Sequence, residues 1–310
     1  MSDVRTKISE KIGINTDNLP RKIAYNTIKS SKENGYERKL IEYDSCGETV
    51  IAYLLIPDVV NINPGILINH QHNGERHLGK SEVCGLAGDP LQAFGPMLAQ
   101  RGFVVLAPDS ICFEDRRIGA QGTTPLPDED DLLQHYNEMC YRILMGQELL
   151  IKRVLTDAMN GITLLSGLSF VEGKNIGTLG HSYGGNTVLF LSAMDERISF
   201  SCASGSACTY RNKMDNGVGI EMSGVIPGFA EKYDIQDLVR CIAPRRLLIV
   251  SAEDDDYSKD ADYIVEQALP AYSKDNNEHN LYHKRYPGGH ALTKERSDFI
   301  VEWIAGGRSY

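Results

Sequence analysis

A serine between glycines separates a strand-like from a helix-like segment of this 310-residue chain. Residues 180–185 read Gly-His-Ser-Tyr-Gly-Gly, a Gly-x-Ser-x-Gly pattern centred on Ser182. Glycines on both sides allow a tight turn from strand to helix, which exposes the serine hydroxyl beside the free N–H groups of a helix N-terminus. The pattern is typical of a nucleophilic serine, but three fixed residues also occur in ordinary glycine-rich turns. The flanking segments therefore decide between the two interpretations.

Both flanking segments favour the nucleophile. Residues 175–179, Asn-Ile-Gly-Thr-Leu, form a short strand candidate. Apolar residues in 188–193 have the spacing of a helix that begins near Gly184. The order strand, serine, helix is the one that an exposed nucleophile requires.

A nucleophilic serine needs a general base, and His290 is the best candidate. It is the last histidine of the chain and ends the sequence Pro-Gly-Gly-His at 287–290. This loop follows the predicted strand 281–286 and precedes a closing helix, so it can bring the imidazole to the serine. His279 and His283 lie before or within that strand and have the character of surface positions. A surface loop histidine is the alternative interpretation of His290.

The carboxylate that orients the base is expected after the predicted strand 246–250. Residues 251–256 read Ser-Ala-Glu-Asp-Asp-Asp, so four acidic residues follow one another. The distance from the strand end favours Asp255 as the orienting carboxylate, with Asp254 second. The sequence leaves Asp256 open as a further candidate. A solvated loop or a weak cation site would have the same composition.

An oxyanion hole needs two backbone N–H groups directed at the developing charge. One is expected from Tyr183, the residue after the nucleophile. The other is expected from the loop 70–74, His-Gln-His-Asn-Gly, which follows the predicted strand 65–69. We predict the N–H of Gln71 or His72 as this second donor.

A metal site is the competing interpretation of the same loop. His70, His72 and His77 with Glu75 resemble a set of metal ligands, and two histidines at i and i+2 on a strand end share one face. The remaining ligands would have to come from a flexible loop, however. Because the serine already accounts for the site, we expect no metal and no other cofactor.

Composition and net charge limit the kinds of molecule that this protein is expected to bind. A net charge of −10 disfavours nucleic acid and anionic membranes. No run of 18 apolar residues and no signal-peptide pattern is present, which favours a cytoplasmic protein. Seven scattered cysteines without a Cys-x-x-Cys pair are expected to be free thiols. We therefore expect a small-molecule substrate; the oligomeric state is open.

The chain divides into an N-terminal segment and one larger domain. Residues 1–35 are expected to be helical, with a break at Pro20. In 36–310, buried-type strands alternate with helices, which predicts an α/β fold with a mostly parallel sheet covered on both faces. Residues 113–146 interrupt this alternation and are acidic at 128–131. We interpret them as an insertion above the sheet, either a solvated loop or a cap that shapes the substrate site.

The chain resembles the dienelactone-hydrolase-like branch of the α/β-hydrolases, near the acetyl xylan esterase and cephalosporin deacetylase group. The resemblance covers most of 36–305. It is carried by residues 180–185, by His70-Gln71 with 79–82, by 105–109 with 113–116, and by 242–245. It implies an eight-stranded sheet and hydrolysis of small esters without metal or organic cofactor.

The chain departs from this family at two positions. Dienelactone hydrolases use a cysteine nucleophile where this chain has Ser182, and the usual His-Gly of the oxyanion loop is His-Gln here, with Gln71 in place of glycine. The resemblance also implies a structural ion pair, rather than substrate binding, for Arg116 and Arg117.

The residues and the resemblance together predict a serine esterase acting on a small or acetyl ester. An amidase or peptidase of the same fold and a non-catalytic binding protein are the alternatives. Substrate specificity is expected in the insertion and in 209–230. Tyr210, Tyr233 and Met222 are candidates for the pocket wall, although isolated aromatic residues more often serve packing.

Overall fold

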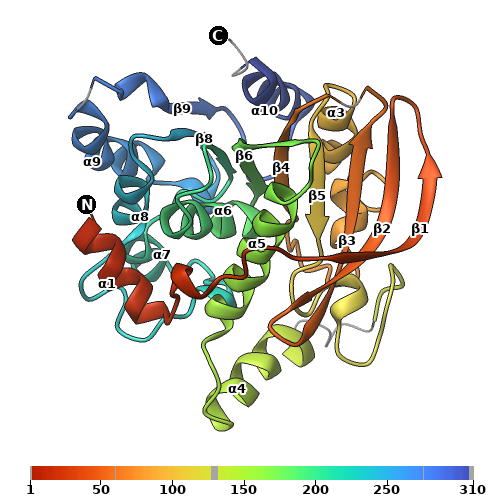
Figure 1. The fold of residues 1–310 in the computed structure, drawn as a ribbon. Coiled ribbons are helices and arrows are strands. Elements are labelled where there is room, and N and C mark those ends of the chain that lie inside the picture. Colours follow the sequence, from red (N-terminus) through yellow and green to blue (C-terminus); the bar gives the residue numbers. More distant parts are fainter. Residues whose placement is uncertain (1, 60, 127–131, 275, 307–310) are drawn as a thin grey trace.

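A mixed sheet of nine strands forms the centre of the computed structural model, which describes residues 2–59, 61–126, 132–274 and 276–306 (Figure 1). The strand order is β1-β2-β3-β5-β4-β6-β7-β8-β9. The strands are β1 (Tyr25–Lys32), β2 (Tyr36–Ser45), β3 (Glu48–Pro57), β4 (Asn63–Asn69), β5 (Val104–Pro108), β6 (Val171–His181), β7 (Phe200–Ser204), β8 (Arg246–Ala252) and β9 (Leu281–Tyr286). The predicted α/β class with a mostly parallel sheet is confirmed, but the sheet has nine strands rather than eight.

The N-terminal segment differs from its prediction. It is helical over Ser2–Ile12, whereas Tyr25–Lys32 forms the edge strand β1, antiparallel to β2. The expectation of helix over 1–35 is therefore wrong for this second part. The side chains of β1 are mostly exposed, so its sequence lacks the apolar alternation by which a half-buried strand is recognised. Its conformation depends on pairing with β2, which local sequence does not reveal.

Strands β4 to β9 are parallel to one another, and their side chains belong to two hydrophobic cores. Leu67 of β4 belongs to one hydrophobic cluster, whereas Ile66 and Ile68 belong to the other. Such alternation follows from the period of two along a strand. Each face of the sheet therefore requires its own cover of helices.

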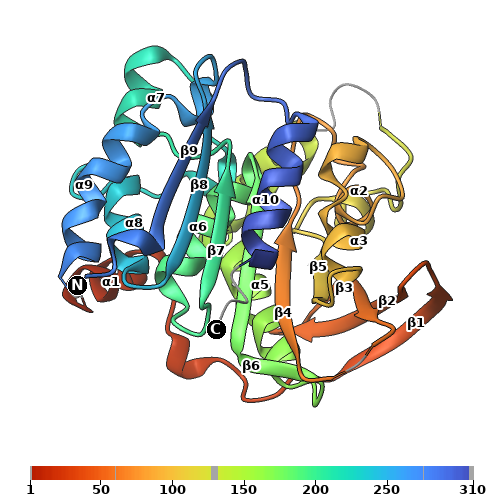
Figure 2. The ribbon, with the colours of Figure 1, turned by 90° about the horizontal axis from the view of Figure 1, so that it is seen from above.

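The two faces are covered by different helices (Figure 2). Helices α1, α5, α6, α8 and α9 contribute to one cluster, and α3 and α10 to the other. The helices are α1 (Ser2–Ile12), α2 (Lys80–Val83), α3 (Phe94–Ala99), α4 (Asn137–Leu144), α5 (Leu150–Ser166), α6 (Tyr183–Met194), α7 (Tyr210–Asn216), α8 (Ile235–Ile242), α9 (Ala261–Ser273) and α10 (Lys294–Gly306). None of the helices in the described ranges has both the length and the apolar character needed to cross a bilayer.

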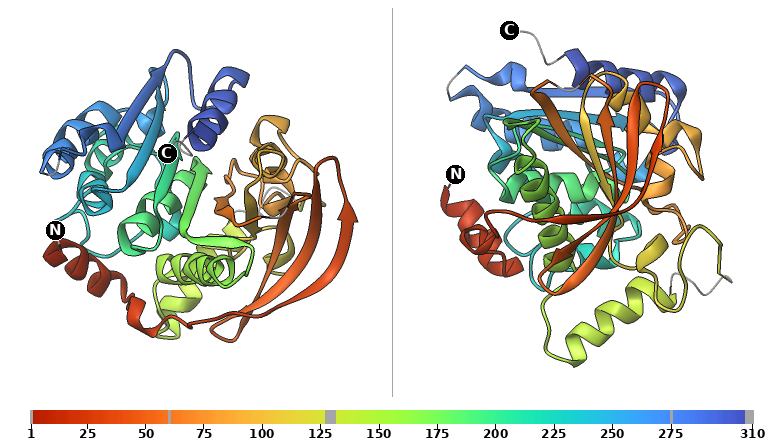
Figure 3. Two further views of the ribbon diagram at one scale, coloured as in Figure 1. Left: turned by 45° about the horizontal axis from the view of Figure 1, so that its top comes forward. Right: turned by 45° about the vertical axis from the view of Figure 1, so that its right-hand side comes forward.

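The predicted insertion contains a short 3₁₀ turn, η3 (Glu114–Arg116), and the helix α4. Figure 3 shows α4 projecting away from the body of the molecule. Its end is apolar and exposed, with Leu144 80% accessible. The acidic run at 128–131 lies outside the described residues.

Candidate active site

The turn that holds Ser182 is strained and tightly packed. Ser182 has φ 56° and ψ −120°, a conformation uncommon for a residue with a side chain, and its N–H donates to the carbonyl oxygen of Ser204 at 2.8 Å. A Cβ on Gly180 would lie 2.2 Å from the carbonyl carbon of Gly184. A Cβ on Gly184 would lie 2.1 Å from the carbonyl oxygen of Asn69. Both glycines are therefore required by the close approach of β4, β6 and α6.

The structure brings the three predicted side chains together. His290 Nε2 lies 2.8 Å from Ser182 Oγ, and His290 Nδ1 lies 2.9 Å from Asp255 Oδ1. Each comes from a loop beyond the C-terminal end of a strand: Ser182 after β6, Asp255 after β8 and His290 after β9. Because these strands are parallel, their C-terminal ends meet at one edge of the sheet. The serine hydroxyl can thus pass its proton to an imidazole that is held by a carboxylate.

The environment of Asp255 separates it from the other acidic residues of its loop. Asp255 is 1% exposed, whereas Asp254 and Asp256 are exposed. Its carboxylate also accepts hydrogen bonds from Ser258 Oγ at 2.6 Å and from the N–H of Tyr257 at 3.0 Å. Burial opposes ionisation of this carboxyl, but the hydrogen bonds and the charge of His290 outweigh it and lower the pKa of Asp255. An ionised carboxylate suits a group that must stabilise an imidazolium.

A cavity of about 560 Å³ opens above Ser182. Its wall combines the two reacting groups with side chains from the loop after β4, the insertion and the segment after β7. Beside Ser182 and His290, the lining includes His72, Tyr136, Asn186, Lys213, Glu221 and Met222.

The second oxyanion donor remains a prediction. Tyr183 begins α6, where backbone N–H groups point out of the helix, and borders the cavity. In the loop after β4, His72 borders the cavity, and the buried Gln71 side chain donates to Glu82 Oε1 at 3.0 Å. That hydrogen bond ties the loop to α2.

The histidines of this loop do not converge as metal ligands. His70 Nδ1 lies 2.9 Å from the carbonyl oxygen of Gln71, and its Nε2 accepts the N–H of Ser110 at 3.1 Å. Burial lowers the pKa of His70 to about 4, so the ring is neutral. His72 Nδ1 lies 2.8 Å from Glu221 Oε1. Among the described residues, only three carboxylates elsewhere gather closely enough to hold a cation.

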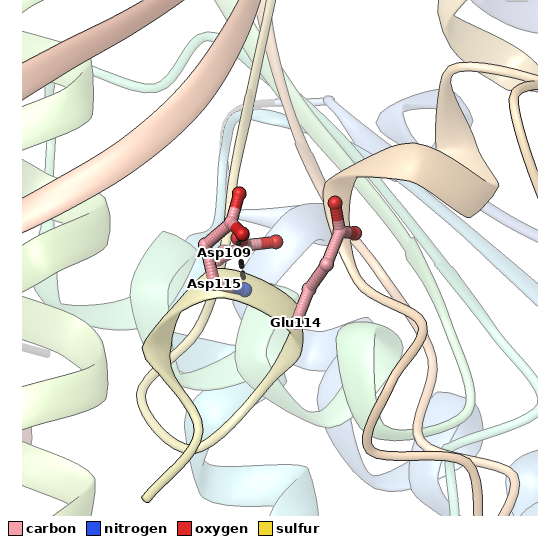
Figure 4. Close-up of side chains that lie close together, drawn as sticks. All are labelled: Asp109, Glu114 and Asp115. Carbon is pink, nitrogen blue, oxygen red and sulfur yellow. Dashed lines mark hydrogen bonds between the residues drawn. The ribbon is translucent and has the colours of Figure 1, made fainter. Parts of the chain in front are cut away.

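These carboxylates belong to Asp109, Glu114 and Asp115, at the end of β5 and in η3 (Figure 4). The ammonium of Lys80 lies among them, with Nζ 2.8, 2.6 and 2.5 Å from their respective oxygens. Burial, only partly offset by the charge of Lys80, raises the pKa of Asp109. A lysine thus takes the place that a metal ion would need. The motifs around 79–82 and 105–116 contain these residues, but the sequence did not show that they meet.

The ion pair predicted for Arg116 is present. Its guanidinium lies 2.9 Å from Asp157 Oδ2 and 3.4 Å from Glu48 Oε2. Arg117 donates to the carbonyl oxygens of Gly122 and Thr124 at 2.9 and 2.8 Å. Arg116 therefore fastens η3 to α5 and β3.

Sequence reasoning missed two residues close to the reacting groups. The buried ring of His181 lies 4.9 Å from that of His290, and burial lowers its pKa to about 3. The ring of Tyr257 also lies 4.9 Å from that of His290. His181 is a neighbour of the serine in sequence, and Tyr257 follows the acidic run, so proximity along the chain was the available signal.

The three candidates for the pocket wall have different positions. Met222 lines the cavity. Tyr210 donates its hydroxyl to the carbonyl oxygen of Gly224 at 2.6 Å and packs edge-on against Phe229. Tyr233 packs against the same ring. Both tyrosines therefore serve packing.

Comparison with known proteins gives relatives of low identity but close structure. No protein-family model matches the sequence. The "putative hydrolase YtaP" of Bacillus subtilis is 25% identical over 257 residues, which cover 81% of this chain and 80% of that protein. A "putative acetyl xylan esterase" of Bacteroides fragilis superposes with a TM-score of 0.72 at 17% identity, over 92% of this chain and 74% of the other. A glucuronoyl esterase of Solibacter usitatus gives 0.69 at 13% identity, over 98% and 92%.

Proposed function

The chain has the α/β-hydrolase fold, and on that premise we propose that it is a serine hydrolase that cleaves carboxylic esters. One observation carries the proposal: Ser182, on a strained turn beside a cavity, is hydrogen-bonded in series with His290 and Asp255. Structural neighbours named as acetyl xylan and glucuronoyl esterases support an ester rather than another acyl substrate.

The reaction proceeds through an acyl-enzyme. Ser182 Oγ attacks the carbonyl carbon while His290 Nε2 takes the hydroxyl proton, and Asp255 holds the imidazolium. The negative oxygen of the tetrahedral intermediate accepts hydrogen bonds from the N–H of Tyr183 and from the backbone at 71–72. The bond to the alcohol then breaks, and the alcohol leaves with the proton of His290.

Water repeats the sequence on the acyl-enzyme. His290 takes a proton from the water as its oxygen attacks the acyl carbon, and then returns that proton to Ser182 Oγ. The products are a carboxylic acid and an alcohol. The cavity of about 560 Å³ suits a compact ester such as an acetyl ester of a larger alcohol.

Labelling with a fluorophosphonate tests the nucleophile directly. We expect label on Ser182 of the wild-type protein, located by peptide mass mapping, and none on Ser182→Ala. Ser273→Ala, at the exposed end of α9, is the matched control and should be labelled like the wild type. Hydrolysis of p-nitrophenyl esters of increasing acyl length, set beside the matching anilides, then separates esterase from amidase. A folded wild-type protein that takes no label and cleaves no ester would overturn the proposal.

A further inference from the structure

The wall of the cavity contains a buried lysine that the reaction above does not use. Lys213 of α7 is 6% exposed and borders the same cavity as Ser182 and His290. Its ammonium makes neither a hydrogen bond nor an ion pair with any residue that the structure describes. This is unusual, because a lysine that is buried to this extent normally has a charged or hydrogen-bonding partner.

Two nearby carboxylates are engaged by the start of α7. Asp260 accepts the N–H of Thr209 at 3.0 Å and the Thr209 hydroxyl at 2.6 Å. Asp234 accepts the N–H of Tyr210 at 2.7 Å and also begins α8 with a capping box. Both attract Lys213 through space, but they satisfy backbone groups of the helix termini instead of the ammonium.

The third nearby carboxylate faces the cavity from another element. Glu221 borders the cavity and lies 2.8 Å from His72 Nδ1. Burial lowers the pKa of Lys213, and the attraction of the surrounding carboxylates does not compensate for the lost hydration. Lys213 thus borders the space above Ser182 without a hydrogen-bonding partner for its side-chain nitrogen among the described residues.

Asn186 is a second residue with N–H donors that borders the cavity. It lies one turn beyond Ser182 on α6, donates its N–H to the Ser182 carbonyl oxygen at 3.0 Å, and borders the cavity with Lys213. An amide and an ammonium on one wall provide N–H donors for an anionic oxygen pair.

We propose that Lys213 binds a carboxylate carried by the substrate, so that the preferred substrates are esters with a free carboxylate. This inference rests on the proposed esterase function. The expected substrates are the monoesters of dicarboxylic acids and the acyl esters of hydroxycarboxylic acids. The carboxylate supplies the partner that the ammonium lacks, and a hydrogen bond between charged groups strengthens when water is excluded.

Matched pairs of esters test the inference. On the acyl side, p-nitrophenyl glutarate monoester is compared with p-nitrophenyl valerate. On the alcohol side, 4-acetoxybenzoate is compared with 4-methylphenyl acetate. The diagnostic quantity is the ratio of kcat/KM for the charged ester to that for the neutral ester, measured for the wild type, Lys213→Met and Lys213→Arg.

We expect the ratio to fall about tenfold to a hundredfold in Lys213→Met for at least one pair, the range given by a hydrogen bond to a charged group. Lys213→Arg should restore part of it. Lys174→Met, an exposed position in β6, is the matched control and should keep the wild-type ratio. Lys213→Met should also have a higher Tm than the wild type, because it removes an unpaired buried charge. A purely structural lysine would lower Tm on removal and reduce both esters equally.

A ratio that Lys213→Met leaves unchanged in both pairs would overturn the inference while leaving ester hydrolysis intact. Calorimetric titration of glutarate into Ser182→Ala keeps the two proposals apart. Binding that is lost in Ser182→Ala/Lys213→Met supports the carboxylate site even if no ester is cleaved. No binding to Ser182→Ala, with no charged-ester preference in the wild type, contradicts it.

Discussion

Asp255 differs from its acidic neighbours in its surroundings, and this difference predicts its contribution to rate. Asp255→Asn keeps the shape of the side chain but removes the charge that stabilises the imidazolium of His290. We expect kcat to fall roughly 10⁴-fold with little change in fold. Asp254→Asn is the matched control, because that exposed side chain lies outside the hydrogen-bonded series. Steady-state kinetics on a p-nitrophenyl ester measures both; an active Asp255→Asn beside an inactive Asp254→Asn would reverse the assignment.

The raised pKa of Glu82 makes the free energy of unfolding depend on pH. Burial raises the pKa of Glu82 to about 7, although hydrogen bonds from the N–H of Asp89 and from Gln71 oppose the shift. The folded state therefore keeps its proton between about pH 4.5 and 7, where the unfolded chain has lost it. The cost of burying the charged form grows as pH rises through this window and is complete above it.

Glu82→Gln removes that cost while keeping an oxygen that accepts the same two donors. We expect the free energy of unfolding to exceed that of the wild type by up to about 3 kcal/mol at pH 8, and the advantage to vanish near pH 4.5. Urea denaturation at the two pH values measures it. The same difference at both pH values would show that ionisation of Glu82 is not its cause.

Sequence alone located the serine and the histidine more sharply than the carboxylate. Ser182 lies in a motif with fixed geometry, and His290 is the last histidine before the closing helix. Asp255 is one of four consecutive acidic residues, and spacing favoured it without the evidence of burial and of the hydrogen bond to His290 that separates it from its neighbours. Lys213 had no sequence signal at all, because the lack of a partner is a property of three-dimensional surroundings.

At the scale of elements, the backbone of β4 and the backbone at the start of α6 are in direct contact, with no space for a side chain between them. Gly184→Ala would place a Cβ 2.1 Å from the carbonyl oxygen of Asn69, so the two elements must separate. We expect a loss of more than about 2 kcal/mol in the free energy of unfolding, and weaker fluorophosphonate labelling as Ser182 shifts.

Gly173→Ala is the control for this substitution. The nearest atom to a Cβ there is a carbonyl oxygen at 3.7 Å, an ordinary contact distance. Denaturant unfolding and labelling should both be close to the wild type. Full labelling and unchanged stability of Gly184→Ala would contradict the packing argument.

Several parallel strands were predictable because they contain a short, continuous apolar run, as in 66–68 and 247–250. The edge strand β1 was not predictable from the sequence. Exposed polar residues such as those of 29–32 have only a weak local preference, and pairing with a neighbouring strand overrides it. Prediction of elements therefore succeeded where a strand is buried and apolar. It failed for β1, whose conformation depends only on pairing with a neighbouring strand.

At the scale of the whole molecule, the N-terminal helix shares the core of the larger unit. Ile8 and Ile12 are almost completely buried in the same hydrophobic cluster as Leu238 of α8. Arg5 fastens this helix by donating to the carbonyl oxygens of Ala193 at 2.9 Å and Cys241 at 2.6 Å.

Ile8→Ala tests this shared core. It leaves a cavity between α1 and its neighbours, and we expect a loss of about 2–5 kcal/mol in a single unfolding transition. Ile28→Ala in β1 removes the same atoms from a side chain that is 53% exposed, and should cost far less. A separate early transition in Ile8→Ala would show instead that α1 unfolds independently.

The sheet ends in β1 on one side and β9 on the other, and an open edge is a template on which further strands of other molecules can grow. Lys29 and Lys32 stand on β1, where the pairing register with β2 also shifts beside Thr27, and Lys284 and Arg285 stand on β9. Charged side chains and an irregular register discourage edge-to-edge addition of a second sheet. Both margins of the sheet thus carry features that disfavour pairing with another molecule.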